Sequence, residues 1–534
     1  MQRIAHGSAS SFDLEEEEAA AFALPASSKP IPFGYLFPDL QNDPDSLLPE
    51  SPATLDSLAL LGATMFDPGD DPQFNSRIPS AYTYLGQFVD HDIAFTKVEK
   101  TPPTLTDSCS LDDPNLRPWS WTEICSKVKN QRTAILQLDC VYGDVPPNPP
   151  PPRAKDDDQL MAVGRVSPNP KSSRVVGKDV NNDLLRTEMC KVPKNDRIAM
   201  IGDPRNDQNL IVSQLHVAFL RAHNALVDFL RGQGLAKPGH EFEQAQRILR
   251  QHYHWIVLHD FLKQIADPVI VDEVLANPNR IYPRDKFFLP LEFTVAAYRF
   301  GHSMIRSTYY LNDNIPGETL QRLFTLTALS DDLKPTPGKG FPTLPESKII
   351  QWRRFVGGSR NKNVARQIRT RLVEPLFALL DETDQPVPCE RRLAVQDLKR
   401  GYMMRIPTGQ AVARALGMPI MSATQIEAVA ADSDQLKVLQ KYGLSSRTPL
   451  WFYCLAEAAH TAQQTRESRL GPVGSRLVAE VIIGLIRRSN DSILAPDFDP
   501  PEPFPMFGET PGEFTLRDLL RLAGVFEAEK DLDH

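Results

Sequence analysis

Residues 84–95 of the 534-residue chain spell YLGQFVDHDIAF, which places one histidine, His91, between two carboxylates, Asp90 and Asp92. The neighbouring side chains are mostly large and apolar, so the trio is expected to lie in the protein interior. A histidine in apolar surroundings stays neutral near pH 7, which suits a group that takes up and returns a proton. A buried carboxylate needs a partner, such as a metal ion or a covalent bond. For this stretch taken alone, a histidine that serves only packing is the more frequent explanation.

The composition limits the class of protein in which this stretch occurs. A hydrophobic content of 41% and a charged content of 24% are typical of a soluble globular protein. The net charge of −9 arises from acidic residues spread along the chain, which disfavours nucleic acid as a partner. None of the 6 cysteines forms a CxxC pair, which argues against a zinc site and against a disulfide scaffold.

The start of the chain carries none of the features of a targeting signal. Residues 1–30 are acidic and rich in alanine and serine, so we predict a mobile tail without a basic segment followed by an apolar one. No apolar run reaches the length of a membrane span, and the longest, 477–486, is interrupted by Glu480. A cytoplasmic or leaderless-secreted location is expected.

The hydrophobic pattern predicts a mainly α fold in which residues 31–534 form one large domain with little β structure. Residues 30–70 are expected to form a long irregular arm, and residues 132–143 an extended or loop-like segment. Proline-rich and polar residues from 146 to about 183 are expected to form surface excursions. Helical periodicity extends over residues 80–95, 207–232, 241–266, 291–305, 363–380, 426–442, 449–462 and 473–488.

Three further segments accompany the opening stretch. They are GDPRNDQN at 202–209, YRFGHS at 298–303, and LAVQDLKRG at 393–401, which is followed by IPTGQ at 406–410. In this order and at these separations the chain resembles the animal-type haem peroxidases of the peroxidase–cyclooxygenase superfamily, particularly their bacterial members. The resemblance runs from about residue 80 to about residue 494 and includes RLGP at 469–472. It implies a helical peroxidase domain that uses hydrogen peroxide to oxidise a halide or a small organic donor, as in the response to oxidative stress.

The resemblance gives four residues a role in peroxide cleavage. It implies that His302 is the proximal iron ligand and that His91 is the distal acid–base catalyst. Arg205 would stabilise the charge that develops during O–O cleavage, because an arginine stays protonated. Gln87, one helical turn before His91, would border the substrate side of the pocket. The alternatives are a packed core histidine for His302 and a surface salt bridge for Arg205.

Further positions are expected around the haem edge. Arg299 and Arg400 suit the haem propionates, although structural ion pairs explain them equally well. Asp90 keeps one of two positions for an ester link to haem, whereas Gln208 replaces the glutamate at the other and forms no ester. Non-covalent haem b, or haem b with one link through Asp90, is therefore expected. Asp397 stands where the family usually has an asparagine beside the proximal histidine, and a carboxylate there would lower the iron potential.

The resemblance also implies a calcium site. Asp92 matches the family's ligand next to the distal histidine, and the remaining ligands would come from a loop. Gln137 stands where the family has an aspartate, and Asp139 stands at a serine position, so one carboxylate has moved by two residues. The predicted calcium ligands are Asp92, Thr133, the Ile135 carbonyl, Gln137 and Asp139.

Two other functions are compatible with the resemblance. A fatty-acid dioxygenase of the cyclooxygenase branch would need a tyrosine three residues before the proximal histidine, where this chain has Arg299, with Tyr298 one residue earlier. A non-catalytic haem-binding or adhesive relative would lack the distal pair, and His91 and Arg205 are both present. The donor substrate and the oligomeric state are not determined by the sequence.

Overall fold

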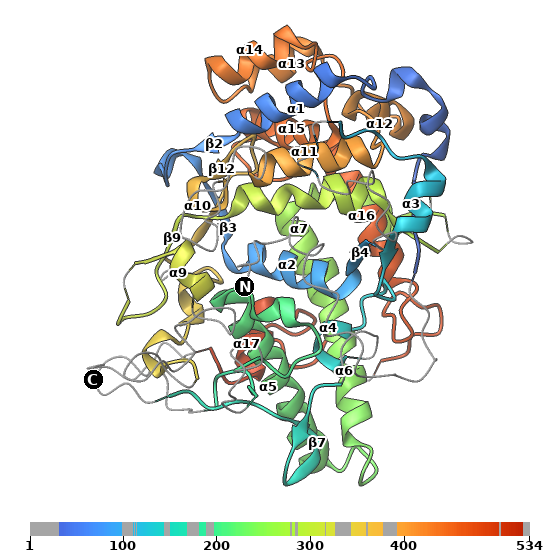
Figure 1. The fold of residues 1–534 in the computed structure, drawn as a ribbon. Coiled ribbons are helices and arrows are strands. Elements are labelled where there is room, and N and C mark those ends of the chain that lie inside the picture. Colours follow the sequence, from blue (N-terminus) through green and yellow to red (C-terminus); the bar gives the residue numbers. More distant parts are fainter. Residues whose placement is uncertain are drawn as a thin grey trace.

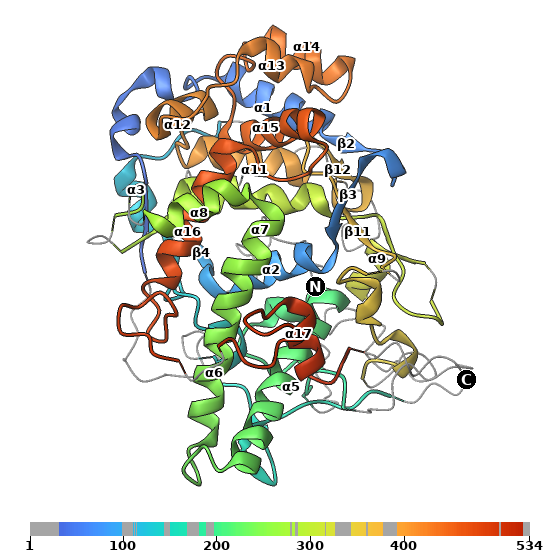
Figure 2. The same ribbon diagram turned by 180° about the vertical axis from the view of Figure 1, so that it is seen from behind.

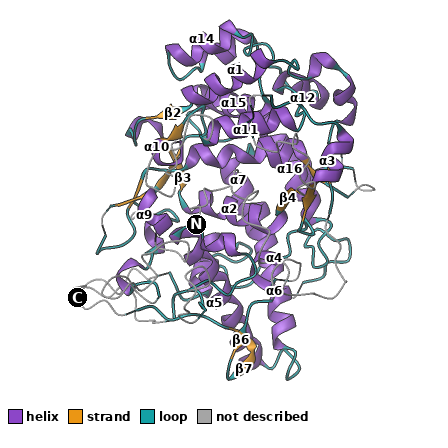
Figure 3. Ribbon diagram, viewed as in Figure 1, coloured by secondary structure: helices purple, strands orange, loops and turns teal. Residues whose placement is uncertain are grey.

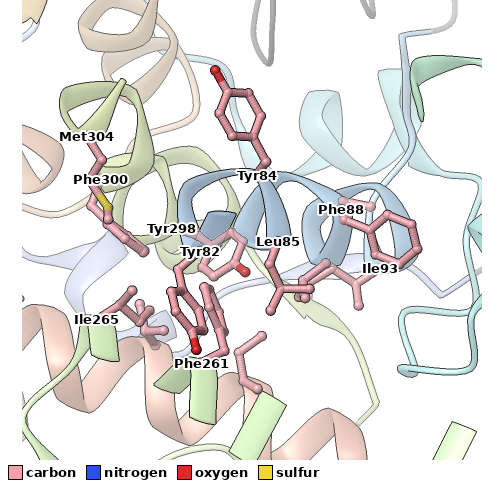
Figure 4. Packing of buried hydrophobic residues seen from close by; sticks show 14 of the residues in the cluster. Tyr82, Tyr84, Leu85, Phe88, Ile93, Phe261, Ile265, Tyr298, Phe300 and Met304 are labelled. Atoms are coloured by element: carbon pink, nitrogen blue, oxygen red, sulfur yellow. The ribbon is translucent and has the colours of Figure 1, made fainter. Parts of the chain in front are cut away.

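The stretch around His91 folds as α2 (Ala81–Ile93), a helix that lies inside the molecule (Figure 1). The computed structural model describes residues 31–98, 111, 113, 115–143, 150–167, 181–187, 197–277, 280–283, 287–315, 317–325, 343–358, 361–377, 392–500 and 504–526. The predicted N-terminal tail, residues 1–30, lies outside these described residues. Side chains of Leu85, Phe88 and Ile93 on α2 are buried, so this helix belongs to the core (Figure 4).

Helices make up most of the described chain, as predicted (Figure 3). The first part contains α1 (Pro52–Thr64), α3 (Trp121–Lys127), α4 (Asp139–Tyr142), α5 (Leu210–Gln233), α6 (Glu241–Trp255), α7 (Leu262–Ile265) and α8 (Pro268–Ala276). The second part contains α9 (Leu320–Thr325), α10 (Glu374–Phe377), α11 (Leu393–Met403), α12 (Gly409–Leu416), α13 (Ala423–Ala428), α14 (Ser433–Lys441), α15 (Leu450–Thr465), α16 (Pro472–Ile486) and α17 (Leu516–Leu522).

The strands are short and form separate two-stranded pairs in the part of the chain that the structure describes. Two pairs are parallel: β1 (Phe33–Gly34) with β8 (Leu289–Pro290), and β2 (Phe66–Asp67) with β12 (Leu372–Val373). Four are antiparallel: β3 (Asn75–Pro79) with β11 (Val364–Arg366), β4 (Thr96–Val98) with β5 (Val128–Asn130), β6 (Arg153–Ala154) with β7 (Asp157–Met161), and β9 (Thr308–Tyr309) with β10 (Glu318–Thr319). Three of the six pairs, β1 with β8, β2 with β12 and β3 with β11, connect segments distant in sequence.

Helix α5 crosses the core beside α2 and packs along α6 (Figure 2). Asn209 begins α5 by accepting hydrogen bonds from the N–H groups of Ile211 and Val212, and Gly234 ends it in the left-handed conformation. Helix α5 is long and apolar enough to cross a membrane, but 83% of its most apolar window is buried within the protein. Burial to that extent is typical of a core helix.

Two predictions from periodicity are wrong. Residues 363–373 were expected to be helical, but Val364–Arg366 is β11 and Leu372–Val373 is β12. Within the predicted irregular arm at 30–70, Pro52–Thr64 forms α1, whose N-terminus is capped by Ser51. Helix α1 packs against α11, so this part of the arm contributes to the core.

Candidate active site

A cavity lies between α2 and the segment that carries His302. That segment forms a π-helical turn, Glu292–Ala296, followed by a 3₁₀ helix, Ala297–Met304. The cavity holds about 730 Å³ of space free of protein atoms, a volume that includes open solvent at its mouth. Its lining includes Gln87, Asp90 and His91 from α2, and Tyr298, Arg299, Gly301 and His302 from the 3₁₀ helix.

His91 is buried on the α2 side of the cavity. Its Nδ1 lies 2.8 Å from the side-chain oxygen of Asn206, which also is fully buried. An amide oxygen only accepts hydrogen bonds, so Nδ1 carries the hydrogen and Nε2 keeps its lone pair. Burial, together with the nearby charge of Arg205, lowers the pKa of His91 to about 3 although Asp203 opposes the shift. His91 is therefore neutral at pH 7, as its apolar surroundings predict.

Gln87 and Asp90 lie beside His91 in the same wall. Asn209, which caps α5, donates a hydrogen bond to Gln87 Oε1 over 3.2 Å. This contact fixes Gln87 at the cavity through an element distant in sequence. Burial raises the pKa of Asp90, while Arg205, Arg299 and His302 oppose that shift. Asp90 is therefore a poorly solvated carboxyl group that faces the cavity.

Across the cavity, His302 is held by Asp397 of α11. Nδ1 of His302 lies 3.0 Å from Asp397 Oδ2, and a carboxylate oxygen accepts its hydrogen. The other oxygen, Oδ1, accepts from Arg299 Nη1 over 2.9 Å and from Arg400 Nη1 over 3.5 Å. Burial opposes the ionisation of Asp397, but Arg299, His302 and Arg400 outweigh burial and lower its pKa. Asp397 is therefore an ionised carboxylate that interacts with His302, Arg299 and Arg400 at the same time.

Arg299 and Arg400 thus make the structural ion pairs that were the alternative to propionate binding. Arg299 lines the cavity as well, so its propionate role stays a prediction. Arg400 is buried beside Asp397 and is not among the described residues that line the cavity. Burial and repulsion by Arg299 lower the pKa of Arg400 to about 9, against the attraction of Asp397.

Arg205 holds the end of α2. Its guanidinium bonds the carboxylate of Asp203, and its Nη2 donates to the carbonyl oxygens of His91 and Ala94 over 3.0 and 2.7 Å. The guanidinium also lies 4.6 Å from the ring centre of Phe95. Arg205 is not among the described residues lining the cavity, so the structure shows it fixing the main chain behind His91. Its role in O–O cleavage stays a prediction.

The predicted calcium loop wraps around Asp92. The carboxylate of Asp92 accepts hydrogen bonds from the backbone N–H groups of Leu138 and Cys140 over 3.1 and 3.2 Å. These two donors are the residues directly before and after Asp139 in the chain. The Thr133 hydroxyl donates to Asp139 over 2.7 Å. Burial raises the pKa of Asp92 to about 6 despite these backbone bonds. No cluster of three or more histidine, cysteine or acidic side chains suited to a metal occurs among the described residues.

The other two predicted calcium ligands lie in the same loop. The backbone turns through left-handed conformations at Ala134 and Leu138, on either side of Ile135 and Gln137. The carbonyl oxygen of Gln137 accepts a hydrogen bond from Arg250 over 2.6 Å. Ile135 and Gln137 are both buried. The loop therefore closes around the predicted site, and the binding of an ion by either residue stays a prediction.

The family can be assigned from comparison with known sequences. A family model described as animal haem peroxidase matches residues 117–481, which is more than half of the chain. The chain belongs to the animal haem peroxidase family. The matched residues include Arg205, His302 and Asp397, whereas the stretch around His91 precedes them. For the distal side the evidence is therefore the geometry of the cavity.

The curated relatives are distant in sequence and longer than this chain. The chain is 28% identical over 303 residues to a peroxidase-like protein of Margaritifera margaritifera, covering 50% of this chain and 35% of that one. It is 24% identical over 253 residues to the peroxidase mlt-7 of Caenorhabditis elegans, covering 42% and 32%. The aligned part is thus about a third of the length of these relatives.

Solved structures share the helical fold of this animal haem peroxidase. Peroxidase A of Dictyostelium discoideum aligns with a TM-score of 0.55 and 15% identity, covering 90% of this chain and 91% of that chain. The fatty acid alpha-dioxygenase of Oryza sativa aligns with a TM-score of 0.52 and 15% identity, covering 85% and 74%. The structural alignments support the mainly α fold. Sequence identities this low do not indicate which reaction the chain catalyses.

The residues of the cavity fit a haem group. Asp397 accepts the hydrogen of His302 Nδ1, which leaves the Nε2 lone pair as a ligand for iron. Beside His302, a Cβ added at Gly301 would meet no atom within 4 Å, so this part of the wall is open. Arg299 at the cavity supplies a cation for a propionate.

Three supporting residues were not predicted from the sequence. Asn206 bonds His91, Asn209 bonds Gln87, and the indole N–H of Trp451 donates to the carbonyl of Arg299 over 3.2 Å. The Trp451 ring centre lies 6.4 Å from that of His302. Asn206 and Asn209 lie in the GDPRNDQN segment that was recognised for Arg205. Their positions shortly after that arginine are the signal that could have indicated a role in the same site.

Proposed function

We propose that this chain is a haem-dependent peroxidase that uses hydrogen peroxide to oxidise a halide or a small organic donor. The observation that carries the proposal is the pair of histidines facing one cavity from two elements. In both His91 and His302, a buried oxygen acceptor holds the hydrogen on Nδ1, so each presents Nε2. A neutral base and an iron ligand require this same tautomer.

On the distal side, His91 moves the proton. Its Nε2 takes a proton from one oxygen of hydrogen peroxide and returns it to the other, which leaves as water. Gln87, fixed by Asn209, orients peroxide through its amide. Arg205 keeps the backbone of His91 in place and adds positive charge behind the imidazole. The predicted interaction of Arg205 with the departing oxygen would require its guanidinium to turn from Asp203.

On the proximal side, His302 would hold the iron of haem b and Arg299 would pair with a propionate. Haem, when bound, supplies the iron at which the O–O bond is cleaved and from which the donor is oxidised. Asp397 attracts the Nδ1 hydrogen of His302 and increases the electron density of the imidazole. Arg299 and Arg400 share the charge of Asp397, so they limit that effect. Asp90 faces the cavity as the residue for a single ester link.

We also propose that calcium binds at the loop around Asp92. Support comes from two carboxylates and a hydroxyl: backbone N–H groups on both sides of Asp139 bind Asp92, and the Thr133 hydroxyl donates to the Asp139 carboxylate. Calcium favours such oxygen ligands, and the Ile135 carbonyl and Gln137 would complete the set. Metal analysis of protein purified without chelator tests this proposal, and protein without calcium would contradict it.

An absorption spectrum followed by turnover with a donor panel tests the main proposal. A Soret band and peroxide-dependent oxidation of a phenol, iodide or thiocyanate are expected. A Soret band without oxidation of any donor would instead support a non-catalytic haem-binding relative. Complete release of haem by acid–acetone would exclude an ester through Asp90.

A fatty-acid dioxygenase is the second candidate, because Tyr298 lines the cavity four residues before His302. The Tyr298 hydroxyl donates to the carbonyl of Gly86 over 3.2 Å, and its ring stacks on Phe293. A tyrosine held in this way is oriented toward α2. Oxygen consumption with a polyunsaturated or a saturated fatty acid, in the absence of another donor, would favour this candidate.

A further inference from the structure

A row of three buried polar side chains runs from the cavity into α5. Behind the 2.8 Å contact between His91 Nδ1 and Asn206 Oδ1, the amide nitrogen of Asn206 lies 2.9 Å from Nδ1 of His216. All three side chains are buried, and Asn206 and His216 have no exposed surface. Asn206 lies in the 3₁₀ turn Pro204–Asp207, whereas His216 lies one and a half turns inside α5.

The amide of Asn206 couples the tautomers of its two neighbours. The amide oxygen can only accept a hydrogen bond and the amide nitrogen can only donate one. The ring nitrogen that faces the oxygen must therefore be a donor, and the ring nitrogen that faces the amide nitrogen must be an acceptor. With oxygen toward His91, the hydrogen of that ring is on Nδ1, and Nδ1 of His216 is a bare acceptor. If the amide turned over, its N–H would face His91 and force the hydrogen onto Nε2. A histidine with hydrogen on Nε2 cannot take a proton from peroxide at that atom.

Asp203, which shares Arg205 with the carbonyl of His91, does not compete for the His91 ring. Asp203 is bonded by the buried guanidinium of Arg132 and by Arg205 through both its main chain and its side chain. Its charge is thus balanced by two arginines. Within the described residues, the side-chain hydrogen-bond partner of the His91 ring is Asn206.

We propose that Asn206 and His216 form a relay that keeps the hydrogen of His91 on Nδ1 and leaves Nε2 as the proton acceptor. Asn206 makes the contact, and His216 supports this direction of the amide by accepting from its nitrogen, with its own hydrogen on a buried Nε2 that has no hydrogen-bond partner among the described residues. Both are positioning residues that act through His91. The inference rests on the proposed function, since it names what prepares His91 to act as a base.

Neutron diffraction of the wild-type protein tests the relay directly and needs no variant or turnover. Hydrogen is expected on Nδ1 of His91 and on Nε2 of His216, with the amide oxygen of Asn206 toward His91. Hydrogen on Nε2 of His91, or a reversed amide, would overturn the relay. This result does not depend on whether the protein is a peroxidase.

Cyanide association with the haem-loaded protein gives a second readout, because hydrogen cyanide must lose its proton to a distal base on binding. Asn206→Leu and His216→Leu are each expected to slow association about 10- to 100-fold, as for loss of other partners that orient a functional histidine. His216→Gln restores most of the rate, since its amide oxygen can accept from Asn206. Equal rates in Asn206→Leu and wild type would overturn the relay.

The matched control is His223→Leu, which removes another buried histidine of α5. His223 bonds the Tyr142 hydroxyl over 2.9 Å and is outside the relay, so association should match wild type. A slowing in His223→Leu equal to that in His216→Leu would show a general effect of lost core histidines and overturn the assignment. A protein that binds no haem would refute the proposed function, whereas the neutron map would still decide the tautomer.

Discussion

Replacing Asp397 with asparagine should destabilise the protein at neutral pH. Asp397 and Arg400 have side-chain exposures of 0% and 3%, and Arg299 has 14%. The asparagine oxygen can still accept from His302, but the two guanidinium groups lose their counter-charge. Removing one partner of a buried ion pair typically costs 3–5 kcal/mol. Because asparagine keeps one bond, we expect the free energy of unfolding to fall by about 3 kcal/mol at pH 7.

The pH dependence of this loss has a defined sign. Burial opposes the ionisation of Asp397, but Arg299, His302 and Arg400 outweigh it and lower its pKa below the value in the unfolded chain. The stabilisation by this carboxylate is therefore present above the unfolded pKa and is lost as the pH falls through the folded pKa. The difference in the free energy of unfolding between wild type and Asp397→Asn should narrow as the pH falls from about 5 to about 3.

Urea unfolding followed by circular dichroism at pH 7 and at about pH 3.5 measures both effects. The matched variant is Asp397→Asn combined with Arg400→Met, which removes the stranded charge and should recover part of the lost free energy. Asp397→Asn within about 0.5 kcal/mol of wild type, or a double variant no more stable than the single one, would refute the reasoning.

The ferric/ferrous potential of haem-loaded Asp397→Asn should rise by about 40 mV, which corresponds to about 1 kcal/mol for weakening one charged hydrogen bond; an unchanged potential would count against electron donation through His302. Burial raises the pKa of Glu457 to about 8, although N–H groups of Val473 and Gly474 oppose the shift. The folded state then retains a proton that the unfolded state has released, so wild-type stability should fall by about 2 kcal/mol between pH 6 and pH 8. Glu457→Gln should lack this slope in urea titrations, and an unchanged slope would assign it to other groups. Chelation should lower the melting temperature of wild type but not of Asp92→Asn, and equal shifts in both would argue against calcium at Asp92.

Local sequence was sufficient for the elements that carry the two histidines. The apolar spacing of 80–95 and 207–232 predicted α2 and α5, because both helices bury a continuous face. The segment 291–305 was predicted to be a buried helix and is helical throughout its central part. Its turns are π and 3₁₀ rather than α, and Tyr298 and Arg299 in the 3₁₀ part both line the cavity.

Long-range contacts explain where periodicity failed. Residues 364–366 have helix-compatible spacing, but they pair with β3, and buried Arg366 bonds Asn75 and Asp67. No local signal identifies partners nearly 300 positions away. Helix α1 was missed although Ser51 and Pro52 form a standard N-terminal signal, because the surrounding prolines suggested irregular structure.

The candidate site divides in the same way. His91, Gln87 and His302 were predicted by their motifs, and the structure brings all three to one cavity. Asp397 was predicted beside His302 and bonds it, whereas Asn206 and Asn209, the partners of His91 and Gln87, were not predicted. Arg205 and Arg400 were both singled out from the sequence, but their contacts were not predicted. The guanidinium group of Arg400 contacts Asp397, and that of Arg205 contacts Asp203.

The central claim is that His91 is the base in a peroxide-cleaving site opposite His302. It is tested most directly by the rate of peroxide-dependent donor oxidation in wild type and His91→Leu, each normalised to its Soret absorbance. Loss of a positioned general acid–base should lower the rate about 10²- to 10⁴-fold while haem remains bound. Equal rates at equal haem content would contradict the claim.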